Sequence, residues 1–248
     1  MNGFVILDKP ARLTSHDCCE KVKEILNAKK TGHAGTLDIG VTGVLVIAMD
    51  ESVKLLRLFS GLPKEYVGEA ILHKEVSLEK LNDAINKKFL GKIKQIPPKR
   101  SRVKRQERER EIFEFKILNK EGRRFSYKVS CQAGTYIRKL IDDLGTELRI
   151  KANMTKLRRT KHSCFDEKES IVLEELSKEK VIDSIDAIKR IGVKIIKVND
   201  QQEQELRKGK SLDISTKEED FMVAVNKDRI IALVKKKNNL IKPERVLN

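Results

Sequence analysis

The most informative stretch of the chain is TGHAGTLDIGVTG, residues 31–43. Its glycines allow the backbone to bend sharply and to come close to a ligand. The stretch contains one carboxylate, Asp38, and one histidine, His33. Two interpretations are open for Asp38: a catalytic carboxylate held at a cleft, or a turn former bonded to its own loop. A lone histidine such as His33 is more typical of a structural group or a phosphate contact than of a general base.

The segments around this stretch have clear periodicities. Thr14 and Asp17 have the spacing of a helix capping box, and the apolar face after them predicts a helix that ends before residue 29. Residues 29–42 predict a loop. We expect strands at residues 4–7, 44–48, 66–72, 113–117, 125–131 and 154–161, and helices at 53–59, 78–89 and 136–148.

The pattern changes near residue 191, where short strands follow one another. They are expected at residues 194–198, 221–225, 230–234 and 244–247. We therefore expect an α+β protein with two domains. The first covers residues 1–190, and the second, residues 191–248, is small and β-rich.

The chain is strongly basic. Its 248 residues include 53 Lys and Arg against 37 Asp and Glu, which gives a formal net charge of +16. Such a balance is typical of proteins that bind nucleic acid, and a charge-rich surface adapted to heat is the alternative. Positive charge is densest at residues 99–110, where seven of twelve residues are Lys or Arg. A phosphate-binding loop and a solvated face are both open for this run.

Several classes of protein are disfavoured. No run of about 18 apolar residues predicts a membrane-spanning helix, and the first ten residues lack the pattern of a secretory signal. None of the four cysteines lies in a CxxC pair, which disfavours a zinc site and a disulfide framework. We therefore expect a cytoplasmic protein with no bound metal and no membrane partner.

Two further residues gain meaning in combination with Asp38. Arg138, in GTYIRKLIDDLG, begins an expected helix, and its guanidinium can pair with a carboxylate or a phosphate. The alternative is a surface arginine on an amphipathic helix. Tyr66, in KEYVG, begins an expected strand, and its ring can stack on a nucleobase. The alternative is a core tyrosine.

Together and in this order, these stretches resemble the TruB-type pseudouridine synthases. The resemblance is greatest to their archaeal and eukaryotic branch, the dyskerin-like catalytic subunits of H/ACA guide-RNA particles. The matching stretches are GFVILDKPARLTS (3–15), KKTGHAGTLDIGVTGVL (29–45), KEYVG (64–68), IPPKRSRVKR (96–105), AGTYIRKLIDDLG (133–145) and MTKLRRTK (154–161). HxGTLD followed by GTYIR is the most specific part of the resemblance.

The resemblance implies a role for each candidate residue. Asp38 matches the essential aspartate, and Arg138 matches the arginine that pairs with it. Tyr66 matches the tyrosine that stacks on the target base and helps to remove a ring proton. The residues expected to bind the RNA substrate or to support that binding are His33, Tyr136, Lys9, Arg102, Lys104, Arg105, Arg158 and Arg159. Lys9, with Pro10, matches a motif that supports the catalytic loop.

A fold, a reaction and partners are implied as well. We expect the pseudouridine synthase fold, with a largely antiparallel mixed sheet, followed by a PUA-like RNA-binding domain at residues 191–248. The reaction breaks the bond between uracil N1 and ribose C1′ and rejoins the base through C5. It involves no redox change and no net hydrolysis, so no cofactor is expected. The expected partners are an rRNA or tRNA substrate, an H/ACA guide RNA and the small proteins of that particle, in the cytoplasm of an archaeal-type cell.

Two alternatives to a guide-RNA particle remain open. One is a stand-alone enzyme that modifies the T-loop of tRNA. The other is a non-catalytic RNA-binding assembly factor, against which the intact Asp38, Tyr66 and Arg138 argue.

The chain departs from the family pattern at three places. Arg12 stands where a glycine is usual, and Ile39 stands where a proline is usual. Ser163 and Cys164 stand where Gly-Pro is common. None of these changes removes a catalytic group, but each bears on the geometry of its loop.

Overall fold

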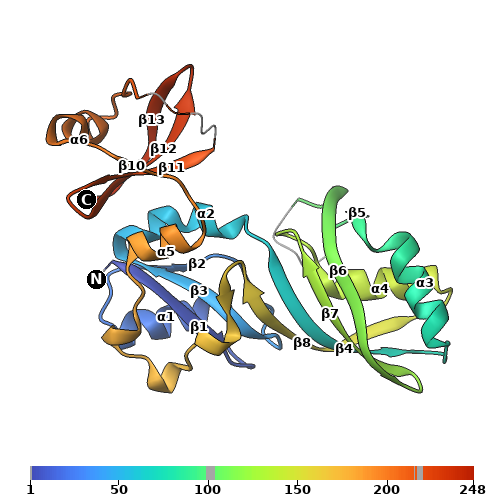
Figure 1. Cartoon of the computed structure of the whole chain (residues 1–248). Coiled ribbons are helices and arrows are strands. Elements are labelled where there is room, and N and C mark those ends of the chain that lie inside the picture. Colours follow the sequence, from blue (N-terminus) through green and yellow to red (C-terminus); the bar gives the residue numbers. More distant parts are fainter. Residues whose placement is uncertain (1, 99–103, 215, 217–219) are drawn as a thin grey trace.

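Two β-sheets organise the chain (Figure 1). The computed structural model describes residues 2–98, 104–214, 216 and 220–248. Within these residues the main sheet has nine strands in the order β1-β3-β8-β4-β7-β6-β5, with β2 beside β3 and β9 beside β8. Its strands are β1 (Gly3–Lys9), β2 (Thr31–His33), β3 (Thr42–Met49), β4 (Lys64–Leu72), β5 (Gly91–Gln95), β6 (Arg108–Glu121), β7 (Arg124–Cys131), β8 (Ala152–His162) and β9 (Phe165–Asp166).

The helices beside this sheet contribute to three hydrophobic clusters, and that of α2 and α5 also includes residues of the C-terminal sheet. These helices are α1 (Ser15–Ile25), α2 (Leu56–Ser60), α3 (Leu78–Lys88), α4 (Ile137–Glu147) and α5 (Ser184–Arg190), with short 3-10 turns at Asp50–Leu55, Glu167–Glu169, Leu173–Glu175 and Lys178–Lys180. The apolar faces of α3 and α4 pack on β4, β6 and β7 in one hydrophobic cluster. The buried face of α1 packs on β1 and β3 in another.

The main sheet is mixed, with a single parallel pair among the described strands. In that pair β3 runs beside β8, with Thr42 next to Arg158 and Gly43 next to Arg159. The other neighbours are antiparallel. The α+β class and the largely antiparallel sheet expected from the sequence are therefore confirmed. The parallel pair also brings the end of residues 31–43 directly against β8.

The helix α1 begins as the sequence predicts. The Thr14 hydroxyl accepts a hydrogen bond from the backbone N–H of Asp17, and the Asp17 carboxylate accepts one from the backbone N–H of Thr14. This capping box satisfies donors that the first turn of a helix leaves unpaired. Cys18 and Cys19 are buried on the inner face of α1.

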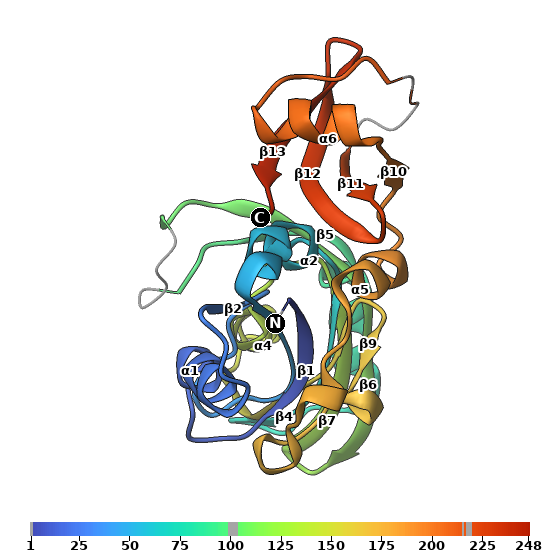
Figure 2. The same ribbon diagram turned by 90° about the vertical axis from the view of Figure 1, so that its left-hand side faces the viewer.

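The C-terminal part of the chain forms a separate four-stranded sheet. It contains β10 (Ile195–Lys197), α6 (Asp200–Arg207), β11 (Phe221–Asn226), β12 (Arg229–Lys237) and β13 (Leu240–Val246), in the strand order β10-β11-β12-β13. One of its faces has its own core around Leu206 and Ile241. The other shares a hydrophobic cluster with the main body, in which Val223 and Leu233 join Phe4. In Figure 2 this sheet lies next to α2 and α5. The division at residue 191 stays a prediction, because the two parts share that cluster.

The strands β2, β5 and β9 and the helix α6 are among the elements that the sequence did not predict. The strand β2 lies within the segment interpreted as a loop and pairs with β3. Three residues are too few to carry a periodicity. The helix α6 buries only Leu206, so its sequence has almost no apolar face to reveal it.

The strand β6 contains an irregularity within the expected strand 113–117. Phe113 is 49% exposed, whereas Phe115, two residues later, is buried. The register between β6 and β7 shifts at this point, so that Ile112 and Glu114 pair with successive residues and Phe113 is left over. A β-bulge of this kind turns one side chain away from its expected face.

No helix within residues 2–98, 104–214, 216 and 220–248 is long and apolar enough to cross a membrane.

Candidate active site

The loop that carries Asp38 joins β2 to β3 and is held from inside the protein. The Ser15 hydroxyl accepts a hydrogen bond from the N–H of Leu37 at 2.8 Å and donates to the carbonyl oxygen of Leu37 at 3.2 Å. The Lys9 ammonium donates to the carbonyl oxygens of Ile39 at 3.4 Å and Val41 at 2.8 Å. The exposed tip of the loop is therefore tied to α1 and β1 on either side of the carboxylate.

Lys9 supports this loop from a fully buried position. Lys9 is 0% exposed. Burial lowers the pKa of its ammonium, and electrostatic interactions with Cys18 and Asp38 oppose that shift. The ammonium is therefore enclosed by backbone carbonyls and holds the loop on the side that follows Asp38. Lys9 was counted among the residues that bind the RNA or support that binding, and its role there stays a prediction.

Asp38 projects from the outer side of the loop and forms an ion pair with Arg138. The two side chains are 60% and 58% exposed, so a nucleotide can reach both. The carbonyl oxygen of Asp38 accepts a hydrogen bond from the N–H of Val41 at 2.9 Å. The backbone of Asp38 thus closes a turn, while its carboxylate faces another element.

The position of Arg138 depends on a residue that the sequence did not single out. Arg138 is the second residue of α4, which follows Tyr136. The side chain of Gln95, at the end of β5, accepts a hydrogen bond from the N–H of Tyr136 at 3.0 Å and donates to its carbonyl oxygen at 3.3 Å. Gln95 is 3% exposed. A single glutamine in a strand gives no sequence signal, because only the fold brings it to the start of α4.

Tyr66 lies on β4 beneath the loop. It is 8% exposed, and in the sheet its neighbours are Arg159 on β8 and Val129 on β7. Burial raises the pKa of the Tyr66 hydroxyl, the charge of Arg159 and a hydrogen bond with it oppose the shift, and Asp38 adds to it. The phenol is therefore protonated at neutral pH and lies within electrostatic reach of Asp38.

His33 ends β2 and is half-buried next to the loop. Its Nδ1 accepts a hydrogen bond from the N–H of Gly35 at 3.4 Å. Burial lowers the pKa of His33, and the positive charges of Arg159 and His16 lower it further. The imidazole is therefore neutral at pH 7, with its Nε2 as a donor. The structure places His33 near the loop, in agreement with its expected location.

The remaining expected RNA contacts fall into different surroundings. Lys104 and Arg105 are exposed just before β6, and Arg102 lies outside the described residues. Arg158 forms ion pairs with Asp8 at 2.8 Å and Glu167 at 2.6 Å.

Arg159 has quite different surroundings from its neighbour. It is 1% exposed and is the largest fully buried side chain of the described chain. Arg159 therefore does not contact an RNA backbone directly in this structure, unlike the contact expected from the sequence.

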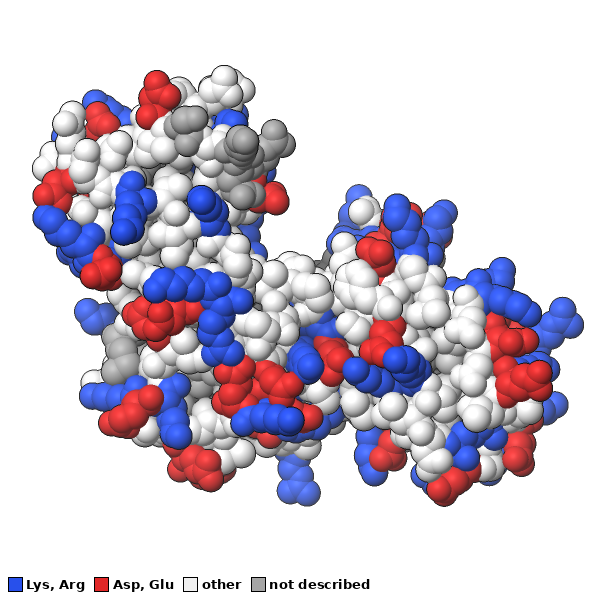
Figure 3. All heavy atoms as spheres, viewed as in Figure 1, with Lys and Arg blue, Asp and Glu red and all other residues white. Residues whose placement is uncertain are grey.

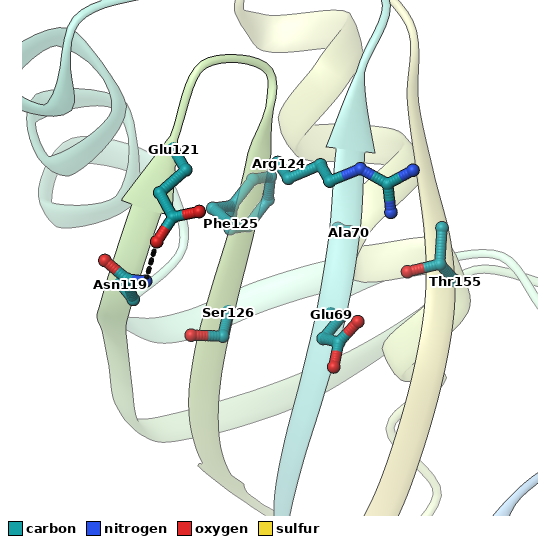
Figure 4. A pocket seen from close by; sticks show the side chains of 8 residues that line it. All are labelled: Glu69, Ala70, Asn119, Glu121, Arg124, Phe125, Ser126 and Thr155. Carbon is teal, nitrogen blue, oxygen red and sulfur yellow. Dashed lines mark hydrogen bonds between the residues drawn. The ribbon is translucent and has the colours of Figure 1, made fainter.

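A shallow cavity lies away from this site (Figure 4). It has a volume of about 220 Å³ and opens on the face of β4, β6, β7 and β8. Its lining residues are Glu69, Ala70, Asn119, Glu121, Arg124, Phe125, Ser126 and Thr155. Asp38 and Arg138 are not among them, so the candidate site is an open surface around the loop rather than this cavity.

Within the described part of the chain, no group of three or more His, Cys, Asp or Glu side chains is placed to hold a metal ion. The candidate site contains one carboxylate, one guanidinium, one phenol and one imidazole. They belong to Asp38, Arg138, Tyr66 and His33. Such groups can bind an anionic sugar-phosphate, orient a carboxylate and transfer protons.

Comparison with known proteins places this site in a family. The chain matches the TruB family pseudouridylate synthase N-terminal domain over residues 23–137. It also matches the C-terminal domain of tRNA pseudouridylate synthase B over residues 138–191. The loop, β4 and Tyr136 fall in the first match, and Arg138 begins the second.

Individual relatives agree with this assignment. A Methanocaldococcus jannaschii protein named "Probable tRNA pseudouridine synthase B" is 45% identical over 174 residues, which are 70% of this chain and 52% of that protein. A protein of the same name from Pyrobaculum arsenaticum is 46% identical over 176 residues, 71% of this chain and 53% of its own length. The matched region thus spans about half the length of these curated relatives.

Solved structures match over almost the whole chain. A crystal structure of a Cbf5-Nop10-Gar1 complex contains a chain that is 30% identical, with a TM-score of 0.85, covering 98% of this chain and 84% of that one. A structure of an H/ACA RNP bound to a substrate RNA matches with 27% identity and a TM-score of 0.82, covering 99% of this chain and 85% of that one. Fold and sequence agree, and the chain belongs to the TruB family of pseudouridylate synthases.

Proposed function

We propose that this chain isomerises uridine in RNA to pseudouridine, with Asp38 as its catalytic carboxylate. One observation carries the proposal. Asp38 and Arg138, which lie 100 positions apart, form an exposed ion pair within electrostatic reach of Tyr66. These three residue types, in these sequence contexts, are the ones that the family resemblance assigns to the reaction.

The arrangement suits a reaction on a nucleotide that has left its helix. A uridine cannot react while it is stacked, so it must turn out of the RNA into the site. The loop tip around Asp38 is open to such a nucleotide, and its backbone is anchored by Lys9 and Ser15. A carboxylate held in this way spends little entropy on reaching the sugar.

The chemical step follows from what each group can do. Asp38 either attacks C1′ of the ribose or removes the proton from C2′, and the bond from C1′ to uracil N1 breaks in both routes. Arg138 orients the carboxylate through its ion pair. Tyr66 lies under the base and passes on the C5 proton at the end of the reaction. Because burial raises the pKa of its hydroxyl, the phenol serves as a proton relay and does not persist as phenolate.

The basic surface supports RNA binding. Lys and Arg side chains are spread over both the small sheet and the main body, interspersed with acidic groups, on the face seen in Figure 3. The same view shows a molecule bent around a hollow between the small sheet and the far end of the main sheet. In the proposal Lys104, Arg105, His33 and Tyr136 contact the RNA near the site, and residues 191–248 form a PUA-like RNA-binding domain.

We propose guide-RNA-dependent action with small partner proteins, chiefly on rRNA and also on tRNA. The solved structures that match most of the chain are Cbf5 complexes with Nop10 and Gar1 or an H/ACA particle with its substrate RNA. Stand-alone action on the T-loop of tRNA is the second candidate, because the curated relatives carry the name tRNA pseudouridine synthase B. We place the protein in the cytoplasm of an archaeal-type cell, as its relatives' sources suggest.

The deciding experiment is a pseudouridine assay with two arms. The purified chain is incubated with uridine-labelled tRNA transcript alone, and then with an rRNA substrate, an H/ACA guide RNA and proteins of the Nop10 and Gar1 type. We expect product only in the second arm. Product from tRNA alone assigns the stand-alone function. Absence of product in both arms, with retained RNA binding, contradicts the proposed activity.

A further inference from the structure

The turn that carries Asp38 presents an apolar side chain to the outside. A hydrogen bond of 2.9 Å between the backbones of Asp38 and Val41 closes this turn, so Ile39 and Gly40 are its two central residues. Ile39 is 57% exposed, the largest fraction among the large apolar side chains of the described residues. The apolar residues on either side of it, Leu37 and Val41, are buried. Single exposed apolar residues are ordinary on a protein surface, but this one directly follows the candidate catalytic carboxylate.

A second segment of the chain is fixed against the same turn. The N–H of Arg12 donates to the carbonyl oxygen of Ile39 at 3.1 Å. The buried ammonium of Lys9 donates to the same oxygen at 3.4 Å and to the carbonyl oxygen of Pro10 at 2.9 Å. These bonds hold the segment before α1 and the turn after Asp38 side by side. Arg12 and Ile39, which we call the rim, are therefore direct neighbours beside the carboxylate.

Arg12 is unusual both in its backbone and in its side-chain surroundings. Its backbone has φ +74°, a left-handed conformation that glycine adopts without steric cost and that an arginine adopts only with strain. The residue is exposed, and its guanidinium makes no hydrogen bond or ion pair with any residue in the described part of the chain. The side chain therefore gives the folded protein no polar contact that offsets the strain. Residues held in this way concentrate at sites that bind ligands.

We propose that the rim binds the nucleotide next to the target uridine, with the Arg12 guanidinium on its phosphate and the Ile39 side chain against its base. The proposal rests on the proposed function. A guanidinium matches the oxygens of a phosphate with paired N–H donors. When a nucleotide turns out of its stack, the neighbouring base loses a partner, and an apolar side chain can cover the face that it exposes. The rim supplies these two groups at the point where the uridine must approach Asp38.

The variant Arg12→Gly tests the phosphate contact without endangering the fold. Glycine accepts the left-handed backbone, so we expect the midpoint of urea denaturation to equal or exceed that of the wild type. The affinity for substrate RNA should fall by about three- to tenfold, and the logarithmic salt slope should drop by about 0.7, the value for one phosphate contact on a single strand. KM should rise with the affinity loss while kcat stays within about twofold, because Arg12 touches no reacting atom.

Arg149→Gly is the matched control. Arg149 is also exposed and left-handed, with φ +58°, but it lies beyond the last residue of α4, at the opposite end of that helix from Arg138. The control variant therefore removes the same charge and relieves the same kind of strain away from the rim. We expect its RNA affinity and salt slope to match those of the wild type. Equal losses in Arg12→Gly and Arg149→Gly overturn the proposal.

The variant Ile39→Ser tests the apolar contact separately. It removes apolar surface and no charge, so we expect the RNA affinity to fall by about threefold with an unchanged salt slope. Leu118→Ser is its control, because Leu118 is 53% exposed on β6, and this variant should keep the wild-type affinity. Equal affinities of Ile39→Ser and the wild type overturn the role of Ile39.

Neutral linkages in the RNA locate the phosphate that Arg12 binds. A methylphosphonate replaces, one at a time, each of the phosphates around the target uridine. At one of them the wild type should lose about as much affinity as Arg12→Gly loses, whereas Arg12→Gly should lose less than about twofold more, because two changes to one contact are not additive. Additive losses at every linkage overturn the contact.

A failure of the proposed function gives a different result from a failure of the rim. A wild-type chain that forms no pseudouridine in either arm of the assay overturns the activity. In that case the tRNA affinities and salt slopes of Arg12→Gly and Arg149→Gly still decide whether Arg12 binds a phosphate. A wild-type chain that makes pseudouridine, together with an Arg12→Gly variant that binds RNA as the wild type does, overturns the rim alone.

Discussion

At the scale of single residues, Asp38 supplies the reactive group of its loop, and the glycines at and near the loop permit the path of its backbone. Gly43 has φ +102°, and a Cβ there would lie 2.2 Å from the carbonyl oxygen of Arg159. Gly40 has open space around it. The two glycines lie three positions apart and are under different constraints, which the sequence does not distinguish.

Exchanging each glycine for alanine tests this difference. Gly43→Ala should lower the free energy of unfolding by at least about 2 kcal/mol, because it combines a left-handed backbone with a clash against β8. Gly40→Ala should stay within about 0.5 kcal/mol of the wild type. Urea denaturation of the two variants measures both values. Equal effects would show that the close approach of β3 to β8 is not tight.

The role of Asp38 predicts a separation of binding from chemistry. Asp38→Asn preserves the size of the side chain but has no carboxylate to attack or to accept a proton. We expect unchanged RNA affinity within about threefold and a loss of product formation by about 10⁴-fold or more, the scale at which an essential group acts. Filter binding and a pseudouridine assay measure the two quantities. Isomerisation at near wild-type rate by this variant would refute the assignment of Asp38.

At the scale of elements, the end of α2 is fastened to β8 by His162. Its Nε2 bonds to the carbonyl oxygen of Phe59 at 2.8 Å, and the residue is 0% exposed. Burial lowers the pKa of His162 well below its usual value, and the charges of Lys64 and Arg159 lower it further. Among the described residues its Nδ1 has no hydrogen-bond partner. The imidazole is therefore held in its neutral form.

This burial predicts a loss of stability in acid. The pKa of His162 is lower in the folded chain than in the unfolded chain, where it is about 6.5. Below that pH the unfolded chain binds a proton at His162 and the folded chain does not. The free energy of unfolding should therefore fall as pH drops below that value, by up to about 1.4 kcal/mol per pH unit for this one group. In His162→Gln that component is absent. The measurement is urea denaturation of both proteins from pH 7 to 5, and parallel pH profiles would refute the linkage.

At the scale of the whole molecule, positive charge should govern RNA binding. Lys104 and Arg105 are exposed just before β6, and Arg102 lies outside the described residues. We expect replacement of all three by alanine to weaken RNA binding and to flatten its dependence on salt, by about 0.7 to 0.9 in logarithmic slope for each lost phosphate contact. Binding titrations at several salt concentrations measure the slope.

A matched control comes from the outer face of α3. Lys87 and Lys88 are exposed there, and Lys87 already pairs with Asp83 at 3.5 Å. Their replacement by alanine, together with that of Lys80, removes the same charge and should leave the salt slope unchanged. An equal loss in both variants would mean that net charge, and not this loop, sets the affinity.

Two of the residues that depart from the family pattern have unusual backbone conformations. Arg12 has φ +74° and Ser163 has φ +57°, so both residues adopt the left-handed conformation that the usual glycine adopts easily. The N–H of Arg12 still donates to the carbonyl oxygen of Ile39 at 3.1 Å.

The sequence by itself determined most strands, the start of α1, the class of the fold and the loop that carries Asp38. Periodicity, capping and glycine placement are local, and they can be read wherever the pattern runs for several residues. The sequence also identified Asp38, Arg138 and Tyr66 as candidates, and the fold brings these residues to one region of the molecule. Their roles remain predictions.

Only the tertiary structure decided what is long-range. It pairs β3 with β8, which places Arg159 inside the protein beneath the loop, where the sequence suggested an RNA contact. It brings Gln95 to the start of α4 and Ser15 to Leu37. The physical reason is that a side chain's role depends on its burial and on the groups that face it. Both are set by which strands become neighbours, and no stretch of residues contains that information on its own.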